Sequence, residues 1–376
     1  MARPRKSPPP FRADHVGSLL RPPALLEARR RAEQGEITAA ELTAAEDAAI
    51  REAVALQERA GLGAITDGEF RRGHFLVDFL TSLDGIARTD ASYAVAFKGE
   101  HGETSETRSM LAVTGKIRRA RPASVAGFAF LKSATSRTPK LCIPSPTYLH
   151  MRGGRRVVSE RAYPDIEEFW SDLVRAYHAE IADLAAAGCT YLQLDEIVYA
   201  TMCDEAIRAR MRADAIDPDE AVRKYAEVVS AIAAGAPENM TVAVHTCRGN
   251  HRSMWMAQGG YERVAGVVFA QPHVDALFLE FDTDRAGGFE PLRFVAADKT
   301  VVLGLVSSKR PELESKDLLK RRIDEAAKYV PLERLCLSPQ CGFASTELGN
   351  RITPEIQRRK LELVVEVAQE VWGRAA

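Results

Sequence analysis

His245 and Cys247 lie two residues apart in the run Val-His-Thr-Cys, a spacing that suits a metal site on a strand. Side chains two positions apart on a strand point to the same face. A histidine nitrogen and a cysteine sulfur are donors that Zn²⁺ prefers in a tetrahedral site. Two further donors, Glu280 and Cys341, stand at the ends of other apolar runs. The four residues together predict a zinc site, and the alternative is a buried histidine with two unreactive thiols.

Polar side chains also follow other apolar runs of the chain. His15, Gly17 and Ser18 close the first run, Glu69 follows the second, and Asp195 ends the fourth. Burying such groups costs free energy unless they meet partners or a ligand. We therefore expect a ligand site where these runs end. For Glu69 the alternative is a solvated turn residue.

The other four cysteines show no ligand pattern. Cys142, Cys189 and Cys336 lie in or beside apolar runs, which predicts core packing, and Cys203 precedes a helical stretch without a partner. Motifs of other site classes are absent, since the chain contains no GxGxxG after a strand, no P-loop, no GxSxG and no HExxH. Nucleotide sites therefore have no support in the sequence.

The elements that must position these residues alternate between short β-rich runs and long amphipathic helices. Helical patterns cover 39–60, 314–329, a stripe from Ile166 to Leu184 with a capping box at Asp165, and the segment after Thr353-Pro354. Eight strands are predicted, at Ala13–Val16, Ala64–Asp67, Leu141–Ile143, Tyr191–Leu194, Thr241–His245, Ala276–Phe281, Thr300–Leu305 and Leu335–Leu337. This alternation predicts an α/β fold with a parallel sheet closed into a (β/α)8 TIM barrel, and a doubly wound open sheet is the alternative.

One segment does not fit the alternation. Residues 90–140 are polar and contain glycine, with hairpin-like pieces at Val113–Ile117 and Gly127–Leu131. We interpret them as a hairpin insertion after the second strand. Residues 11–376 are then expected to form a single barrel domain, preceded by a disordered tail over residues 1–10.

Composition narrows the class of protein. The 376 residues are 46% hydrophobic and 27% charged, and 51 Lys and Arg against 52 Asp and Glu leave a net charge of −1. A broad nucleic-acid or anionic-membrane partner would need a basic excess. No apolar run approaches the ~18 residues of a transmembrane helix, and no apolar run of a signal peptide follows the basic N-terminus. We expect a cytoplasmic protein without a disulfide framework.

Several motifs, in this order, resemble the catalytic barrel of cobalamin-independent methionine synthase. The resemblance runs from about Phe11 to Gly373 and is greatest to the stand-alone, single-barrel relatives of that enzyme. Its pieces are His15-Val16-Gly17-Ser18, Asp67-Gly68-Glu69-Phe70, Gln193-Leu194-Asp195-Glu196, His245 to Asn250, Leu279 to Asp282, Leu303 to Val306 and Ser338 to Phe343.

The resemblance implies a zinc ion held by His245, Cys247, Glu280 and Cys341. It also implies an amino-acid pocket, in which Gly17 and Ser18 hold the carboxylate of homocysteine and Glu69 and Asp195 hold its ammonium. His15, from the same motif as Gly17, is placed with the substrate-binding residues, and Asp195 is the candidate catalytic residue. The implied reaction is zinc-dependent transfer of a methyl group to homocysteine, which gives methionine.

The chain departs from the family on the side of the methyl donor. No Trp lies between Leu141 and Gly154, the acidic residue expected six positions after Asp195 is Thr201, and the proton-donating His after the seventh strand is replaced in Val306-Ser307-Ser308-Lys309. The length also leaves no room for the additional N-terminal barrel of the full-length synthases. The expected partners are a small-molecule thiol and a methyl donor, which is a methylfolate or a methylcobalamin carried by a corrinoid protein. Two alternatives are an epoxide:coenzyme M type of thiol transferase and a zinc- and thiol-binding protein without turnover.

Overall fold

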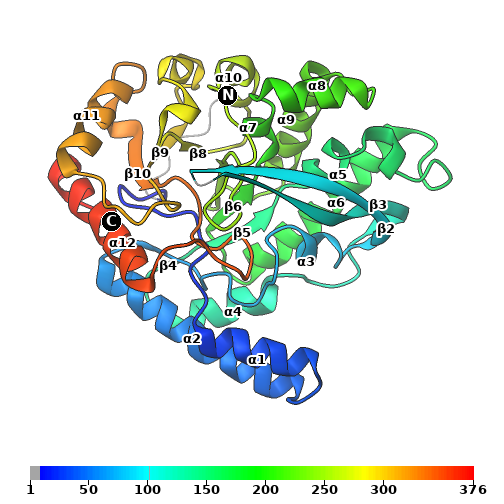
Figure 1. Cartoon of the computed structure of the whole chain (residues 1–376), viewed down its shortest axis with the longest axis horizontal. Coiled ribbons are helices and arrows are strands. Elements are labelled where there is room, and N and C mark those ends of the chain that lie inside the picture. Colours follow the sequence, from blue (N-terminus) through cyan, green and yellow to red (C-terminus); the bar gives the residue numbers. More distant parts are fainter. Residues whose placement is uncertain (1–8, 101) are drawn as a thin grey trace.

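Six of the eight predicted strands form one parallel sheet in the computed structural model, which describes residues 9–100 and 102–376 (Figure 1). They pair in chain order, as β5 (Leu141–Pro144), β6 (Tyr191–Asp195), β7 (Thr241–Thr246), β8 (Ala276–Glu280), β9 (Thr300–Val306) and β10 (Leu335–Pro339). A doubly wound sheet reverses its strand order at a switch point. The sequential order within these six strands therefore contradicts the open-sheet alternative.

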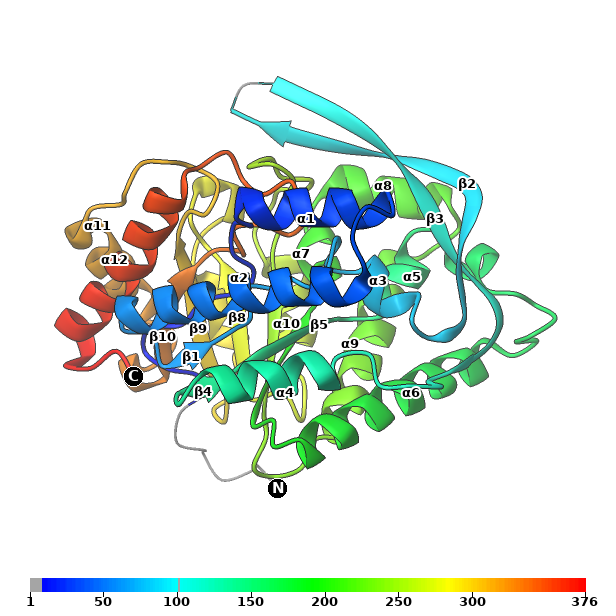
Figure 2. The same cartoon turned by 90° about the horizontal axis from the view of Figure 1, so that it is seen from below.

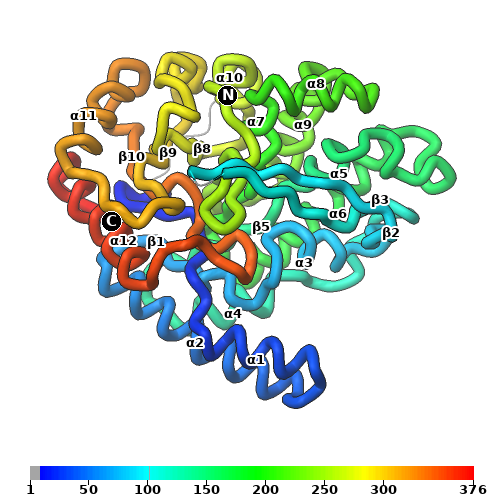
Figure 3. Tube along the Cα trace, in the orientation of Figure 1, coloured from blue at the N-terminus to red at the C-terminus, as the bar shows by residue number. Residues whose placement is uncertain are grey.

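The two remaining predicted strands are shorter than expected. The strand predicted at Ala64–Asp67 is β1 (Ala64–Ile65), which pairs with β4 (Thr138–Pro139) just before β5 begins. The first, Ala13–Val16, is an extended segment with a single bridge from Ala13 to Leu337 of β10, because the chain turns at Gly17 (φ 141°) before a longer ladder can form. Figure 3 shows this N-terminal segment beside β10.

The interior of the sheet confirms the TIM-barrel fold. One buried cluster is formed by Val16, Ala64, Tyr191, Ala243, Ala276, Phe278, Val302 and Cys336, which come from seven of the eight predicted strands. Residues from so many strands can pack on one another only if the strands surround a common axis. The Thr66 hydroxyl also donates to the Gly17 carbonyl at 2.7 Å and so links the first segment to the end of β1.

Helices surround the strands and cover their outer faces. Their bounds are α1 Pro23–Glu33, α2 Ala39–Ala60, α3 Val77–Leu80, α4 Val125–Ala134, α5 Thr147–Met151, α6 Ile166–Ala186, α7 Val198–Thr201, α8 Glu205–Ala213, α9 Pro218–Ala234, α10 Glu262–Val268, α11 Lys316–Ala326 and α12 Pro354–Trp372. Asp165 caps α6 through the N–H of Glu167, without the predicted capping box, whereas Thr38 and Glu41 form a complete box at α2. Among the described helices, none is long and apolar enough to cross a membrane.

The insertion is a long antiparallel hairpin, β2 (Asp84–Gly99) and β3 (Gly102–Arg118), across one end of the barrel (Figures 1 and 2). It was expected within 90–140, so the hairpin begins and ends earlier than predicted. The expectation of a hairpin-like piece at Gly127–Leu131 is wrong, because this segment lies in α4, where the buried Phe128 and Leu131 recur at helical spacing. Residues 1–8 of the expected disordered tail lie outside the described residues.

His150, at the outer layer of the barrel, gives a testable pH dependence. Its Nδ1 lies 2.8 Å from the Tyr225 hydroxyl, and its ring packs on Trp170. Burial, and to a smaller extent the positive charge of Arg155, lowers the pKa of His150 to about 4. The folded state then binds fewer protons than the unfolded state, whose histidine pKa is about 6.5, so stability is lost as the pH falls from about 6.5 toward 4. Between pH 7 and 5 we expect His150 to account for about 1–2 kcal/mol of lost unfolding free energy. Urea unfolding of wild type and His150→Phe at both pH values measures this, and equal losses in the two proteins would contradict it.

Candidate functional site

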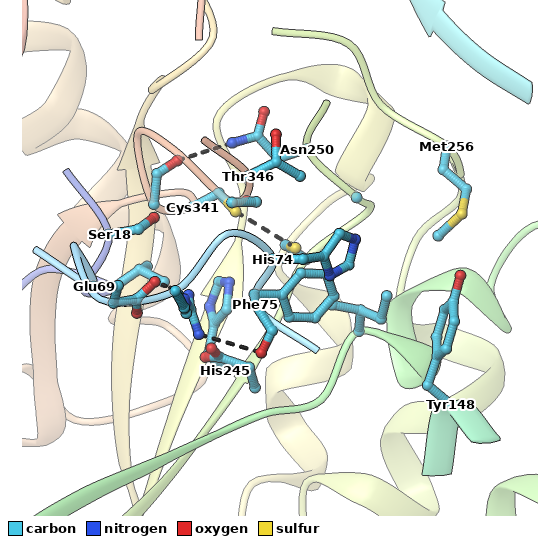
Figure 4. A pocket seen from close by; sticks show the side chains of 18 of the residues that line it. Ser18, Glu69, His74, Phe75, Tyr148, His245, Asn250, Met256, Cys341 and Thr346 are labelled. Atoms are coloured by element: carbon cyan, nitrogen blue, oxygen red, sulfur yellow. Dashed lines mark hydrogen bonds and ion pairs between the residues drawn. The ribbon is translucent and has the colours of Figure 1, made fainter. Parts of the chain in front are cut away.

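Three of the four predicted metal ligands meet at the carboxyl ends of β7 and β10. His245 and Cys247 belong to the end of β7 and Cys341 follows β10, and one ligand atom of each lies within 4.8 Å of the other two (Figure 4). All three side chains are buried. The two sulfur atoms are 3.6 Å apart.

The geometry of this cluster fits a metal ion. Two thiolates bound tetrahedrally at ~2.3 Å would be about 3.8 Å apart, close to the observed separation. Both ring nitrogens of His245 are buried without a hydrogen-bond partner among the described residues. Buried polar atoms are rarely left unpaired, so the imidazole requires a ligand or an ion.

The two thiols are electronically unequal. The hydrogen bond between the sulfurs lowers the pKa of Cys341 well below its ordinary value, and His245 lowers it further against the effect of burial. The same hydrogen bond raises the pKa of Cys247, and burial of the thiol raises it further. The two sulfurs therefore differ in their tendency to ionise, and a thiolate is the form of cysteine that binds metals.

Glu280, the fourth predicted ligand, ends β8 next to the cluster but is not one of its members. Its carboxylate accepts the N–H of Arg248 at 2.9 Å, pairs with Arg285 at 2.8 Å and lies 4.0 Å from the ammonium of Lys309. Burial would raise its pKa, but Lys309, Arg285 and Arg248 outweigh burial and lower it to about 2. The side chain is thus an anion held by cations at the edge of the cluster.

A cavity opens from the cluster, and three predicted substrate residues line it. Ser18, Glu69 and Asp195 share its wall with His245, Cys247 and Cys341. Figure 4 shows Ser18 and Glu69 on one side of His245 and Cys341, with Tyr148 and Met256 on the other. The structure therefore brings the acidic pair and the metal cluster to one space.

His15 and Gly17 do not line this cavity. His15 is instead buried beside Gln57 of α2, where burial and, second, the charge of Lys140 lower its pKa to about 4. Gly17 shapes the wall from behind, because a Cβ atom there would lie 2.7 Å from both the Glu69 carboxylate and the Cys142 sulfur. Within residues 9–100 and 102–376, no acceptor is found for the backbone N–H of Gly17 or Ser18, which leaves two donors at this turn.

Arg72 is the guanidinium that acts on the acidic residues of the cavity. Glu69 forms an ion pair with Arg72, which follows it by one turn. Burial raises the pKa of Asp195, although His245 and Arg72 act against burial. Two carboxylates beside free backbone N–H groups can match the ammonium and the carboxylate of an amino acid.

Sequence reasoning missed the part of the wall that the hairpin and the loop after β1 supply. Val95, Phe97 and Arg108 of the hairpin line the cavity together with His74 and Phe75. Arg108 contacts His74 at 3.2 Å, and the pKa of His74 is lowered to about 3 by burial and then by Arg108. The alternation of Tyr93, Val95 and Phe97 was a signal for a strand with one apolar face.

The hairpin tip is fixed to the loop that carries the cluster. Lys98 and Trp255 exchange backbone hydrogen bonds of 2.7 and 2.8 Å. His251 lies 2.7 Å from the Glu106 carboxylate and packs against Phe97 at 4.8 Å between ring centroids. His251, in the loop after β7, therefore joins the hairpin to that loop.

The positions that depart from the family pattern have other contacts here. The Thr201 hydroxyl donates to the carbonyl of Val198 within α7. Ser308 donates to Gln340, the neighbour of Cys341, at 2.6 Å. The ammonium of Lys309 is buried 4.0 Å from the Glu280 carboxylate and makes no hydrogen bond to a described residue. A cation therefore occupies the segment where a histidine was expected.

Comparison with known proteins places this site in a wider context. Residues 11–370 match the sequence profile of a family described as "Cobalamin-independent synthase, Catalytic domain". The chain is 43% identical to Bacillus subtilis YxjH, described as an uncharacterized protein, over 96% of this chain and 95% of that protein. It is 23% identical to the 5-methyltetrahydropteroyltriglutamate–homocysteine methyltransferase of Synechococcus sp., over 93% of this chain and 42% of that protein.

A solved structure shows the same architecture. It is a Listeria monocytogenes protein, described provisionally as a vitamin-B12 independent methionine synthase. The two chains are 35% identical with a TM-score of 0.74, and the match covers 97% of this chain and 98% of that one.

Proposed function

The chain belongs to the cobalamin-independent methionine synthase family, whose catalytic domain it matches over residues 11–370, and from this membership we propose that it methylates homocysteine at a zinc site. The observation that carries the proposal is the buried His245, Cys247 and Cys341 cluster, which opens into the same cavity as Glu69 and Asp195. The cluster, with a metal ion bound, suits a thiol, and the acidic pair suits the ammonium group of an amino acid. Homocysteine combines both groups.

His245, Cys247 and Cys341 hold the zinc ion in this proposal, and Glu280 is the exchangeable fourth donor. Zinc bound there lowers the pKa of the substrate thiol, so that a thiolate nucleophile exists at neutral pH. Carboxylate is the weakest of the four donors for this ion. Arg285 and Lys309 already lie beside the Glu280 carboxylate, and they would keep it charged whether or not it held the metal.

The amino-acid end of homocysteine is bound by the opposite wall. Glu69 and Asp195 receive the ammonium, and the free N–H of Ser18, at the turn that Gly17 forms, receives the carboxylate. Fixing both charged groups directs the side-chain sulfur toward Cys247 and Cys341. The hairpin residues Phe97 and Arg108 cover the cavity and limit the access of water.

Methyl transfer forms a bond from carbon to the substrate sulfur and breaks the bond from that carbon to the donor. The electron pair of the broken bond stays on the donor, which is then protonated. A family defined as cobalamin-independent favours a donor other than a corrinoid. Methylfolate is therefore the first donor to test.

The zinc-loaded protein is to be incubated with homocysteine and 5-methyltetrahydrofolate, as mono- or triglutamate, with methylcobalamin, or without donor. Methionine formed with a donor and absent without it is the expected result. Binding of zinc and homocysteine without methionine from any donor would favour the binding protein without turnover.

A second candidate is thiol transfer from coenzyme M to an epoxide. It is favoured by Arg72, a guanidinium in the cavity wall that could pair with a sulfonate. Glu69 and Asp195 act against it, since coenzyme M has no ammonium. A parallel assay with coenzyme M and an epoxide tests this reaction.

Replacement of the acidic pair separates substrate binding from metal binding. In Glu69→Gln and Asp195→Asn we expect the dissociation constant of homocysteine to rise about 10- to 100-fold, because each change removes a charged hydrogen-bond partner worth about 1.5–3 kcal/mol. Zinc content should not change. Calorimetric titration with homocysteine and metal analysis measure the two effects. Loss of zinc from either variant would mean that these residues hold the metal instead.

A further inference from the structure

A cavity of about 380 Å³ lies beside the tip of the hairpin, apart from the cavity of the metal cluster. Its wall is formed by the hairpin tip and by the loops that follow β7, β8, β9 and β10. Among the described residues, the two cavities share no lining residue. A ligand of this cavity would therefore lie outside the pocket assigned to homocysteine.

Two exposed arginines of this wall, Arg252 in the loop after β7 and Arg351 in the loop after β10, are held in neighbouring loops. The Arg351 N–H donates to the Ser253 hydroxyl at 2.9 Å, and the Ser253 N–H donates to the Asn350 side-chain oxygen at 3.1 Å. Within residues 9–100 and 102–376, neither guanidinium has an ion-pair partner. Like charges held close together repel each other unless an anion compensates them.

The two guanidinium groups also act on the same histidine. Burial lowers the pKa of His251, and Glu106 acts against burial. The positive charges of Arg108, Arg252 and Arg351 lower this pKa further. Because such effects weaken with distance, Arg252 and Arg351 both lie near the His251 ring, at the hairpin tip.

Two buried donors of the same wall have no hydrogen-bond partner in the described part of the chain. The side chain of Lys309 is 4% exposed, its ammonium donates no hydrogen bond, and its contact with Glu280 is 4.0 Å long. The indole N–H of Trp255 is buried and unpaired as well. Buried donors are rarely left without an acceptor, so these two groups favour an acceptor in the cavity.

Most carboxylates of the wall are already compensated by a cation. Three ion pairs account for them: Glu100 with Arg310, Glu106 with Arg108, and Asp282 with Arg285. The fourth carboxylate, Glu103, is exposed at the hairpin tip and forms no ion pair with a described residue. The two unpaired guanidinium groups therefore outnumber the one unpaired carboxylate, which leaves an excess of positive charge.

The number of donors favours a phosphate group over a carboxylate. Arginine offers a planar fork of N–H donors that matches phosphate, a lysine ammonium offers three donors and an indole offers one. A carboxylate has two acceptor oxygens, too few for this set, whereas a phosphate has more. One oxygen of Asp282 and the Thr283 hydroxyl also lack partners and can pair with a protonated phosphate oxygen or with water.

We propose that Arg252, Arg351 and Lys309, with the indole N–H of Trp255, bind a phosphate group in this cavity. The phosphate is inorganic phosphate or belongs to a small phosphate ester. Because Thr104 of the hairpin lines the same cavity, the phosphate lies between the hairpin tip and the loops of the barrel. This site goes beyond the proposed methyl transfer and does not depend on it.

Calorimetric titration of the zinc-loaded full chain with inorganic phosphate, glycerol 3-phosphate and acetate tests the site. We expect binding of a phosphate compound and much weaker binding of acetate. Arg252→Gln and Arg351→Gln should each weaken phosphate binding about 10- to 100-fold, the loss expected for one charged hydrogen-bonded partner. Both side chains are exposed, so these variants are expected to fold. The phosphate compound that binds more tightly identifies the source of the group.

Arg210→Gln is the matched control, because Arg210 is an exposed arginine of α8 that has no ion pair with a described residue and does not line the cavity. It removes the same charge and should bind phosphate as the wild type does. Equal phosphate affinity of the wild type, Arg252→Gln and Arg351→Gln would overturn the inference, and so would acetate binding as tight as phosphate binding. Absence of methionine formation would contradict the proposed function alone, since these titrations contain no homocysteine.

Discussion

Cys247→Ser and Cys341→Ser are each expected to lose zinc and methyltransfer activity together. Each change replaces a thiolate by a hydroxyl and leaves two of the three clustered donors. Loss of residues that only support metal ligands lowers affinity about 10- to 100-fold, so loss of a ligand should lower zinc affinity at least about 100-fold. Competition with a chromophoric chelator measures the affinity, and metal analysis after dialysis measures the content.

Cys203→Ser is the control for this experiment. Cys203 is also a buried thiol, but its sulfur donates to the Tyr199 carbonyl and lies outside the cluster. The control should retain zinc and activity, which separates loss of a ligand from loss of any buried thiol. Unchanged zinc affinity in both Cys247→Ser and Cys341→Ser would remove the central assumption of the proposed function.

Lys140→Met is expected to lower the unfolding free energy by about 3–5 kcal/mol, as removal of one partner of a buried ion pair typically does. The Lys140 ammonium lies 3.1 Å from the Asp14 carboxylate, and both side chains are fully buried inside the barrel. The ammonium also lies 4.0 Å from the centroid of the Phe278 ring. Without Lys140, the Asp14 anion stays buried, and the donors left to it among the described residues are the Tyr191 hydroxyl and the backbone N–H groups of His15 and Phe11.

A double variant shows whether the unpaired charge causes this loss. Asp14→Asn in the Lys140→Met background should recover much of the unfolding free energy, because no buried charge remains. The exposed pair of Lys116 and Glu168 is the comparison, and Lys116→Met should cost no more than ~1 kcal/mol. Denaturant unfolding with far-UV circular dichroism measures all four proteins. A Lys140→Met loss no larger than that of Lys116→Met would show that the buried pair does not stabilise the barrel.

This ion pair also explains how the barrel closes where its strands are short. Asp14 lies in the first segment, which has a single bridge to β10, and Lys140 lies between β4 and β5. Lys140 donates as well to the carbonyl of His15 at 2.5 Å. The side chains of Asp14 and Lys140 therefore link the first segment to the chain between β4 and β5, where the backbone pairing is short.

Much of the fold could be predicted from periodicity. The apolar pattern of residues 39–60 predicted α2 with its observed bounds, and six predicted strands appear in one parallel sheet. These predictions hold because apolar spacing and caps act between residues close in the chain. Ala13–Val16 failed as a regular strand because the backbone turn at Gly17 limits its pairing, and the apolar pattern does not report that turn.

The candidate site, like the fold, could be predicted only in part from the sequence. The run from His245 to Cys247 contained two metal donors at strand spacing, and the chemistry of Glu69, Asp195 and Cys341 was readable from residue type and from their places at strand ends. Which donors meet was decided by the tertiary structure. It brings Cys341 to Cys247, pairs Glu280 with Arg285 and Lys309, and buries His15 outside the lining of the cavity.

Residue types and local spacing thus determined a parallel α/β barrel with thiol, imidazole and carboxylate groups at its strand ends. Only the tertiary structure decided that the hairpin covers them, since Glu106 reaches His251 and Tyr93 reaches Tyr148 across the mouth of the barrel. Contacts of this kind depend on the path of the hairpin and on where its tip docks. They join residues far apart in the chain, where no local pattern constrains which side chain faces which.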